Sequence, residues 1–179
     1  MKNIVINIIL FQIGWFACVL TAASNQPLVG AIISLFIIVS HIFISKQYQQ
    51  EIRIIVIAMV IGFFWDSLIV SAGWITYTSG MLSDFMAPYW IVLMWALFAT
   101  TLNYSLSWMK KKLLLAAVFG AVAGPLAYYA GVKLGAVQFV NEINALVALS
   151  IGWAAFTPLL LILSTNKSEQ SKYIDGELV

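Results

Sequence analysis

The segment IGFFWDSLIV (residues 61–70) places one acidic side chain, Asp66, in a run that is otherwise almost entirely apolar. It lies within a longer apolar stretch, residues 54–72, which is long enough to cross a bilayer as a helix. A carboxylate inside such a helix costs about 2.5–3.5 kcal/mol on insertion scales, and its side chain almost always faces the protein interior. The segment therefore predicts a transmembrane helix that carries a buried polar site.

The composition of the whole chain supports a membrane protein. Of its 179 residues, 63% are hydrophobic and only 9% are charged, and the mean hydropathy is +0.98. Soluble domains carry roughly 25% charged residues. The net charge of +2 and the scattered basic residues argue against a nucleic-acid-binding surface. We expect one transmembrane domain, residues 1–163, followed by a polar cytoplasmic tail, residues 164–179, that is disordered.

Six apolar stretches have the length of a membrane span. They cover residues 4–22, 28–44, 54–72, 89–108, 113–134 and 143–163. Because backbone amides in hydrocarbon must bond internally, these stretches predict an all-α, polytopic bundle of six transmembrane helices. The first stretch shares features with a cleavable signal peptide, but it is long and a second span follows at once, so we expect it to stay.

The basic residues predict the orientation of this bundle. In a six-span topology, eight of the nine Lys and Arg residues lie on one side, and Lys133 alone lies on the other. The positive-inside rule places the first side in the cytoplasm, together with both termini.

Polar side chains collect at one level in the outer half of the predicted bundle. Asp66 lies about 18 Å along its helix from the inner edge, at 1.5 Å per residue. Lys133 is the sole cation at that level, so it is the natural partner of Asp66 or Glu142. Other readings stay open: Lys133 extends to the interface, Glu142 is an exposed acid near a helix N-terminus, and Asp66 is purely structural.

This outer polar layer is the predicted site. Its expected ligand-binding residues are Asp66, Trp65, Trp74, Asp84, Tyr128, Tyr129, Lys133, Asn141 and Glu142. Asp66, Glu142 and Lys133 are the candidate catalytic groups, although the sequence leaves open whether any reaction takes place. The chain has no Walker loop, no nucleophile elbow and one histidine, so we expect no metal and no cofactor.

Two further features concern helix packing. Gly120 and Gly124 form a stripe of small residues in the fifth span, and Pro125 predicts a kink beside the site. A second polar layer lies in the inner half, where we expect hydrogen bonds between helices. Its members are Asn7, His41, Thr100, Thr101, Asn103 and Ser107.

Four strings together resemble a known family. They are NIILFQIGWFACVL (residues 7–20), GFFWDSLIVSAGW (62–74), APYWIVLMWALFATTLNYSLSW (87–108) and GAVAGPLAYYAGVKLGA (120–136). The chain resembles, over residues 3–160, a family of small bacterial inner-membrane proteins catalogued as a domain of unknown function. The shared pattern includes Trp65-Asp66, Pro88 and Trp90, Thr101-Leu102-Asn103, and Gly124-Pro125 with Tyr128. The resemblance implies a multi-pass protein of the bacterial inner membrane. Members are often encoded near a cyclopropane-fatty-acid-synthase-like enzyme, which implies a link to membrane-lipid modification.

Three functions fit these observations. The first is a pocket in the outer leaflet, around Asp66 and covered by residues 73–88, that binds or modifies a lipid or another amphipathic molecule. The second is a small secondary transporter or flippase, although no internal repeat supports it. The third is a non-catalytic partner subunit of a lipid-modifying system. The expected partners are the lipid bilayer, an amphipathic ligand and a membrane protein, and not nucleic acid.

Overall fold

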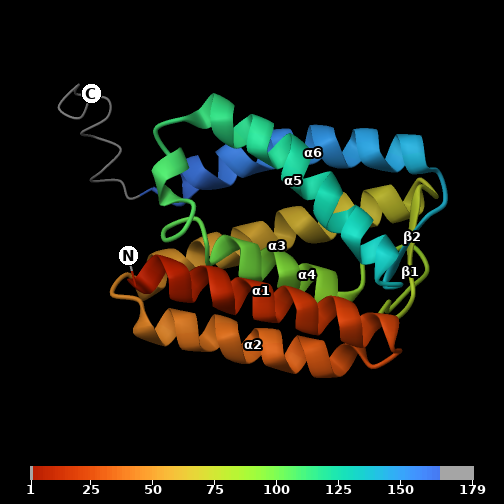
Figure 1. The fold of residues 1–179 in the computed structure, drawn as a ribbon, viewed down its shortest axis with the longest axis horizontal. Coiled ribbons are helices and arrows are strands. Elements are labelled where there is room, and N and C mark those ends of the chain that lie inside the picture. Colours follow the sequence, from red (N-terminus) through yellow and green to blue (C-terminus); the bar gives the residue numbers. More distant parts are fainter. Residues whose placement is uncertain (1, 166–179) are drawn as a thin grey trace.

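A computed structural model describes residues 2–165 of the chain, with side chains from residue 4 onward. This part folds into six α-helices, one 3-10 helix and two short strands (Figure 1). In chain order these are α1 (Lys2–Ala23), α2 (Pro27–Ile44), α3 (Tyr48–Ser71), β1 (Ile75–Tyr77), α4 (Tyr89–Ala99), η1 (Ser107–Met109), α5 (Leu113–Lys133), β2 (Val137–Phe139) and α6 (Glu142–Leu163).

The all-α, six-helix prediction is confirmed. Five of the helices, α1, α2, α3, α5 and α6, are long and apolar enough to cross a membrane. Their outward faces carry large apolar side chains, for example Phe36, Phe64 and Ile151, which are all more than half exposed. Such surfaces match a bundle whose solvent is lipid hydrocarbon. The placement of both termini in the cytoplasm stays a prediction.

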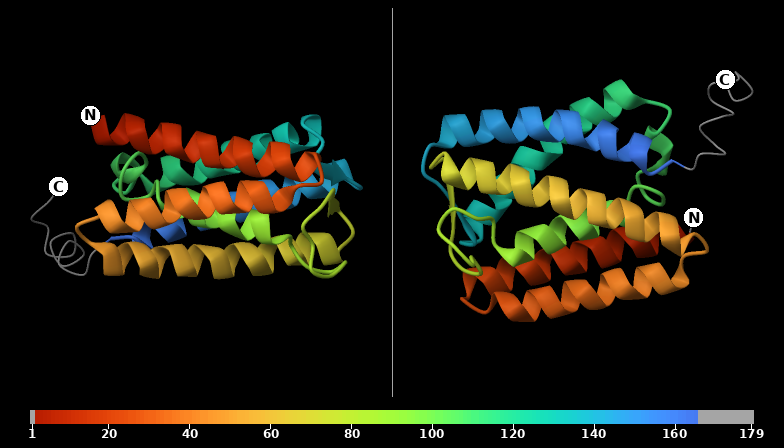
Figure 2. Two further views of the ribbon diagram at one scale, coloured as in Figure 1. Left: turned by 90° about the horizontal axis from the view of Figure 1, so that it is seen from below. Right: turned by 180° about the vertical axis from the view of Figure 1, so that it is seen from behind.

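The helices are arranged as two outer hairpins around a central pair. The α1–α2 hairpin and the α5–α6 hairpin lie on opposite sides of α3 and α4 (Figures 1 and 2). At one end of the bundle, β1 and β2 pair antiparallel, with Ile75 opposite Phe139 and Tyr77 opposite Val137. We call this the ribbon end, and the end at which α3 begins and α6 finishes the opposite end. The ribbon joins the α3–α4 connection to the α5–α6 connection.

The fourth predicted span, residues 89–108, is wrong as a continuous helix. The helix α4 stops at Ala99, and turns follow until η1 begins at Ser107. The hydroxyl groups of Thr100 and Thr101 donate to the carbonyls of Leu97 and Phe98. Polar side chains that bond to nearby backbone compete with helix continuation. The chain therefore completes its passage to the opposite end in irregular conformation.

Two other predictions concern where the third helix begins and where the C-terminal tail begins. The third helix begins at Tyr48, six residues before the predicted span, because the polar turn ahead of Ile54 is itself helical. The predicted disordered tail falls, from Asn166 on, outside the described residues.

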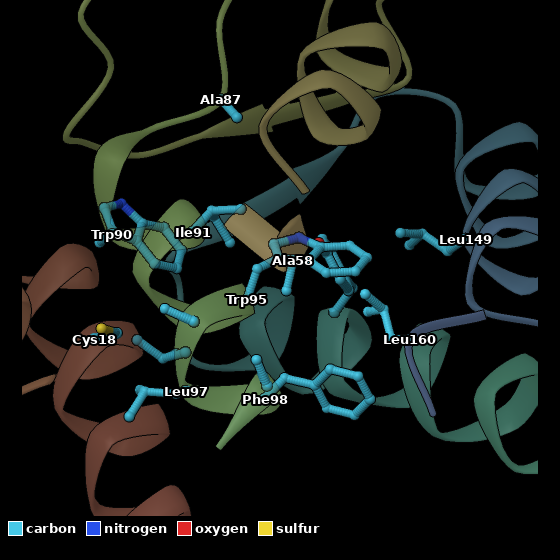
Figure 3. Close-up of a cluster of buried hydrophobic side chains, with 14 of the residues drawn as sticks. Cys18, Ala58, Ala87, Trp90, Ile91, Trp95, Leu97, Phe98, Leu149 and Leu160 are labelled. Atoms are coloured by element: carbon cyan, nitrogen blue, oxygen red, sulfur yellow. The ribbon is translucent and has the colours of Figure 1, made fainter. Parts of the chain in front are cut away.

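The core is built around tryptophans that lie against glycines. Trp95 of α4 is at the centre of the buried cluster (Figure 3) and is only 2% exposed. A Cβ atom added at Gly62 would lie 2.1 Å from the Cγ atom of Trp95, and one at Gly124 would lie 2.3 Å from that of Trp153. The two indole rings stack, with centroids 4.4 Å apart and planes 12° from parallel. Missing side chains on α3 and α5 thus create the space that these rings fill.

Candidate functional site

The carboxylate of Asp66 is the centre of a buried hydrogen-bond network at the ribbon end. Asp66 has no exposed surface. Its Oδ1 atom accepts hydrogen bonds from the hydroxyl groups of Tyr128 (2.6 Å) and Tyr77 (3.0 Å), and its Oδ2 atom accepts one from Nε1–H of Trp95 (2.7 Å). The donors come from α5, β1 and α4, so one side chain of α3 ties together four elements.

The three groups that donate to Asp66 are neutral, whereas the sequence analysis expected a cation, Lys133, as a partner of Asp66 or Glu142. Lys133 is exposed at the end of α5, and its Nζ atom lies 5.0 Å from the ring centroid of Tyr129. Asp66 is therefore stabilised by converging hydrogen-bond dipoles, and Lys133 interacts with an aromatic face near the surface.

The other predicted site residues lie away from the carboxylate. Asp84, Asn141 and Glu142 are exposed at the ribbon end, and Asn141 caps α6 by accepting a hydrogen bond from the Asn144 amide at 3.1 Å. The Trp74 carbonyl accepts hydrogen bonds from the backbone of the β2–α6 connection. Trp65 packs on α6, where it lies against Gly152. Of the predicted ligand-binding residues, Tyr128 is the one that the described structure bonds to Asp66.

Two members of the network, Tyr77 and Trp95, were not among the predicted site residues. Tyr77 lies in a connection and reads as an interfacial aromatic residue, while Trp95 reads as one of several apolar residues in its span. A weak signal existed for Trp95. Gly62 precedes Asp66 by four residues and shares its helix face, so a large ring from a neighbouring helix had room there.

A cavity of about 700 Å³ lies beside this network. Its wall is formed by α1, α4, the irregular segment after α4, α5 and α6, and much of it is aromatic. Cavities that enclose a small ligand usually measure about 300–1,000 Å³. The lining residues include Trp15, Trp95, Phe98, Tyr128 and Trp153. The volume is therefore sufficient for a whole small molecule or for part of a larger one.

The cavity and the Asp66 network share two residues. Trp95 and Tyr128 both line the cavity, and both donate to the Asp66 carboxylate. Asp66 does not line the cavity and is fully buried behind it. Its hydrogen bonds fix the orientation of these two wall side chains.

The cavity extends to the side of the bundle. Ile8 of α1, Trp108 of η1, and Phe119 and Leu126 of α5 line it, although each is 42% exposed or more. Residues that belong to both the wall and the outer surface mark a mouth between α1 and α5. This mouth has apolar rims, so it faces the region that lipid would occupy.

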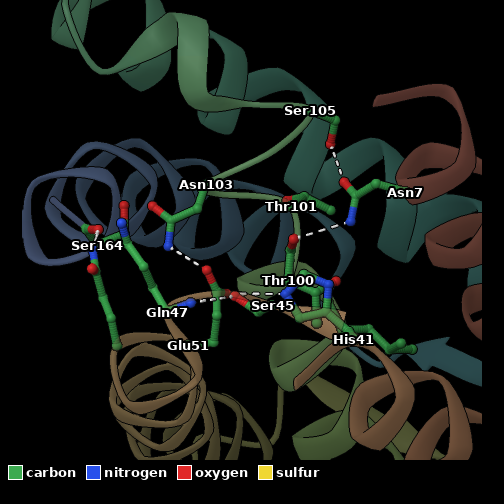
Figure 4. Close-up of polar contacts among 12 residues, drawn as sticks. Asn7, His41, Ser45, Gln47, Glu51, Thr100, Thr101, Asn103, Ser105 and Ser164 are labelled. Atoms are coloured by element: carbon green, nitrogen blue, oxygen red, sulfur yellow. Dashed lines mark hydrogen bonds and ion pairs between the residues drawn. The ribbon is translucent and has the colours of Figure 1, made fainter. Parts of the chain in front are cut away.

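A second polar network lies at the opposite end (Figure 4). Glu51 is 2% exposed, and its two carboxylate oxygens contact Nε2 of His41 at 3.0 Å and Nδ2 of Asn103 at 2.9 Å. The Lys110 ammonium donates to Oδ1 of Asn103 at 2.6 Å. Asn7 donates to the Thr100 carbonyl at 3.1 Å. These contacts hold the irregular segment after α4 against α1 and α3.

The interhelical hydrogen bond predicted for the inner layer is confirmed for His41, which bonds from α2 to Glu51 of α3, whereas Asn7 and Asn103 form bonds between a helix and the irregular segment after α4. The hydroxyls of Thr100, Thr101 and Ser107 bond instead to carbonyls of their own segment. Glu51 was missed because its position in the polar turn before the third span indicates a solvated residue. Residues 2–165 contain no group of three or more His, Cys, Asp or Glu side chains that could hold a metal ion.

The fold and the site together define a small all-helical protein with five membrane-length helices and a lateral apolar cavity. The chain belongs to the family described as "Protein of unknown function (DUF2878)", which matches residues 4–159. The resemblance inferred from the four sequence strings is thereby confirmed at the level of the family. No curated protein matches this chain, and no solved structure does.

Proposed function

We propose that this protein binds a lipid or another amphipathic molecule in the cavity beside Asp66. The observation that carries the proposal is the lateral mouth between α1 and α5, which joins an apolar cavity of about 700 Å³ to the outward face of the helices. A ligand that is dissolved in the bilayer can reach such a site without passing through water.

Asp66 acts as a positioning residue in this proposal. A hydrogen bond to a charged group contributes about 1.5–3 kcal/mol, so the bonds that Trp95 and Tyr128 each donate to Asp66 hold these two side chains firmly in the wall. A rigid wall limits the side-chain ordering that binding would otherwise require.

A substitution that fills the cavity with a larger side chain tests the proposal directly. Ala123 lines the cavity, whereas Val122, the residue before it, is 56% exposed on the outer face of α5. We expect a defined lipid to be retained by the purified wild-type protein and by Val122→Phe, and to be lost from Ala123→Phe. Mass spectrometry of the extracted lipids measures this. Equal retention by both variants would contradict a site in this cavity.

Asp66→Asn provides a second test, because it keeps the side-chain shape and changes the hydrogen bonding. Lipid profiles of cells that lack the gene, complemented with wild type or with Asp66→Asn, show whether the network matters in vivo. We expect wild type alone to restore the profile. Restoration by both would support a partner-subunit role in which Asp66 is structural.

Transport of the ligand across the bilayer is a second candidate. The break after α4 favours it, since non-helical backbone at membrane depth is tolerated where it is buried in protein or lines a cavity. Thr101, Ser105 and Leu106 of this segment line the cavity. A fluorescent lipid in reconstituted vesicles distinguishes the two functions, because transport moves the probe between leaflets and binding alone does not.

A further inference from the structure

Resting on the proposed function, we infer that the cavity holds a whole neutral lipid, head group included, such as a fatty ester, a fatty alcohol or an acylglycerol. The observation behind this inference is the chemistry of the wall. All the residues that line the cavity are apolar, aromatic or neutral polar, and the wall carries no Asp, Glu, Lys, Arg or His.

A charged group placed in such a wall would lose its hydration without gaining a partner of opposite charge. Desolvation of an unpaired ion in an apolar environment is among the largest penalties in protein energetics. Binding sites for lipid anions avoid this penalty with Arg, Lys or a helix N-terminus at the head group. The described cavity has no Arg or Lys in its wall.

The buried acid Asp66 does not place a charged group in the wall, because it is fully buried and does not line the cavity. Its carboxylate lies one hydrogen bond behind the wall, 2.6 Å from the Tyr128 hydroxyl oxygen. Its oxygens accept bonds from two tyrosines and a tryptophan and have no exposed surface, so they do not contact a ligand in the cavity.

Cations near the ends of the bundle have other contacts. Lys133 lies over the ring of Tyr129, and Lys110 donates to Asn103 and, at 3.5 Å, to the Ser164 carbonyl. Neither lysine lines the cavity. A charge on the ligand would therefore have no side chain of opposite charge in the wall of the cavity.

The wall does offer neutral polar groups. Gln12 lines it from α1 and Thr157 from α6. Thr101 and Ser105 line it from the segment after α4. An uncharged hydroxyl, ketone or ester oxygen is the ligand group that such partners suit.

Quenching of tryptophan fluorescence by brominated lipids tests this inference, since Trp15, Trp95, Trp108 and Trp153 line the cavity. Three probes with the same chain would be compared on the purified full-length protein in detergent. They are methyl dibromostearate, dibromostearic acid and the trimethylammonium analogue. We expect saturable quenching by the ester, reversed by unbrominated ester, and at least tenfold weaker binding of the acid anion and of the cation.

The acid supplies an internal control. At acidic pH the acid is protonated, and we expect it then to bind as tightly as the ester measured at the same pH. Ala123→Phe, or the smaller change Ala127→Leu if the first variant does not fold, should weaken the saturable component. Val122→Phe should leave the saturable component unchanged.

The outcomes separate the two proposals. Binding of the anion or the cation as tight as that of the ester would overturn the inference about charge, and the cavity site would stand. Absence of saturable quenching by all three probes would overturn both the neutral-lipid inference and the proposed function.

Discussion

Asp66 accepts hydrogen bonds from three neutral donors on three other elements, which is an unusual environment for a carboxylate in a membrane-length helix. The donors differ in one respect that matters for function. Tyr128 and Trp95 line the cavity, and Tyr77 does not. The same network thus contains residues that belong to the binding site and one that only supports it.

Two tyrosine substitutions separate these roles. Tyr77→Phe and Tyr128→Phe each remove one hydrogen bond to Oδ1 of Asp66, and we expect each to lower the free energy of unfolding by about 1.5–3 kcal/mol. We expect Tyr128→Phe alone to change the affinity for the ligand. Thermal unfolding in detergent and lipid retention measure the two effects. Equal loss of binding in both variants would show that the network acts only through stability.

Alkaline pH provides a second prediction for the network. Tyr77 lies in β1, outside the membrane-length helices, and burial, followed by the negative charge of Asp66, raises its pKa well above the usual 10. As the pH rises through about 10, the unfolded chain loses this proton first, so it binds fewer protons than the folded chain. The stabilising contribution of the raised Tyr77 pKa is therefore fully present below about pH 10, and the stability of the fold then decreases as the pH increases. Unfolding temperatures should fall less steeply above about pH 10 for Tyr77→Phe. Equal slopes in the two proteins would be inconsistent with this assignment.

Among the elements, α4 differs most from an ordinary span. It has 11 residues and begins after Pro88, and its Trp95 side chain is held between α3 and α6. Its continuation to the opposite end is fixed by polar side chains of α1 and α3 rather than by helix geometry. A short helix that extends into an irregular segment leaves part of the bundle unfilled, and the cavity lies there.

Packing of α4 on α3 depends on the absence of a side chain at Gly62. Gly62→Ala would place a methyl group 2.1 Å from the Cγ atom of Trp95, and we expect a loss of about 1–3 kcal/mol in stability. Because Trp95 donates to Asp66, displacement of its ring should also alter the tryptophan emission spectrum. Val60→Ala, at a half-exposed position on the same helix, is the matched control. An unchanged unfolding temperature for Gly62→Ala would show that α3 and α4 can separate at little cost.

For the molecule as a whole, the ribbon and the second polar network define two ends of different character. The ribbon end carries Lys133 as its basic residue in the sequence-based topology, and the opposite end carries the basic run Lys110, Lys111 and Lys112. This asymmetry predicts that the ribbon end faces away from the cytoplasm.

Cysteine labelling tests this orientation. Cys18 is buried and is first replaced by serine, after which single cysteines are introduced as Lys133→Cys and Lys112→Cys, both at exposed positions. We expect a membrane-impermeant maleimide to label residue 133 in intact cells, and residue 112 only after permeabilisation. The reverse pattern would place both termini outside the cytoplasm.

Several features follow from local sequence properties. The apolar stretches that became α1, α2, α3, α5 and α6 are recognisable because span length and hydropathy are local quantities. The importance of Asp66 follows in the same way, since a carboxylate in such a stretch requires a buried partner. The end of α4 at Ala99 was harder to predict from the sequence, because it depends on a distant residue. The side chain of Asn7 donates a hydrogen bond to the carbonyl of Thr100, which directly follows Ala99.

The chain by itself therefore determined the helical class, the number of helices and the presence of a buried acid, because each depends on neighbouring residues. The partners of that acid depended on tertiary contacts: Trp95 and Tyr128 are 29 and 62 residues away along the chain. The same holds for the cavity, which forms where α1, α4, α5 and α6 leave space between them. Such contacts depend on how helix faces pack together, and no periodicity within one segment encodes the identity of a residue on another.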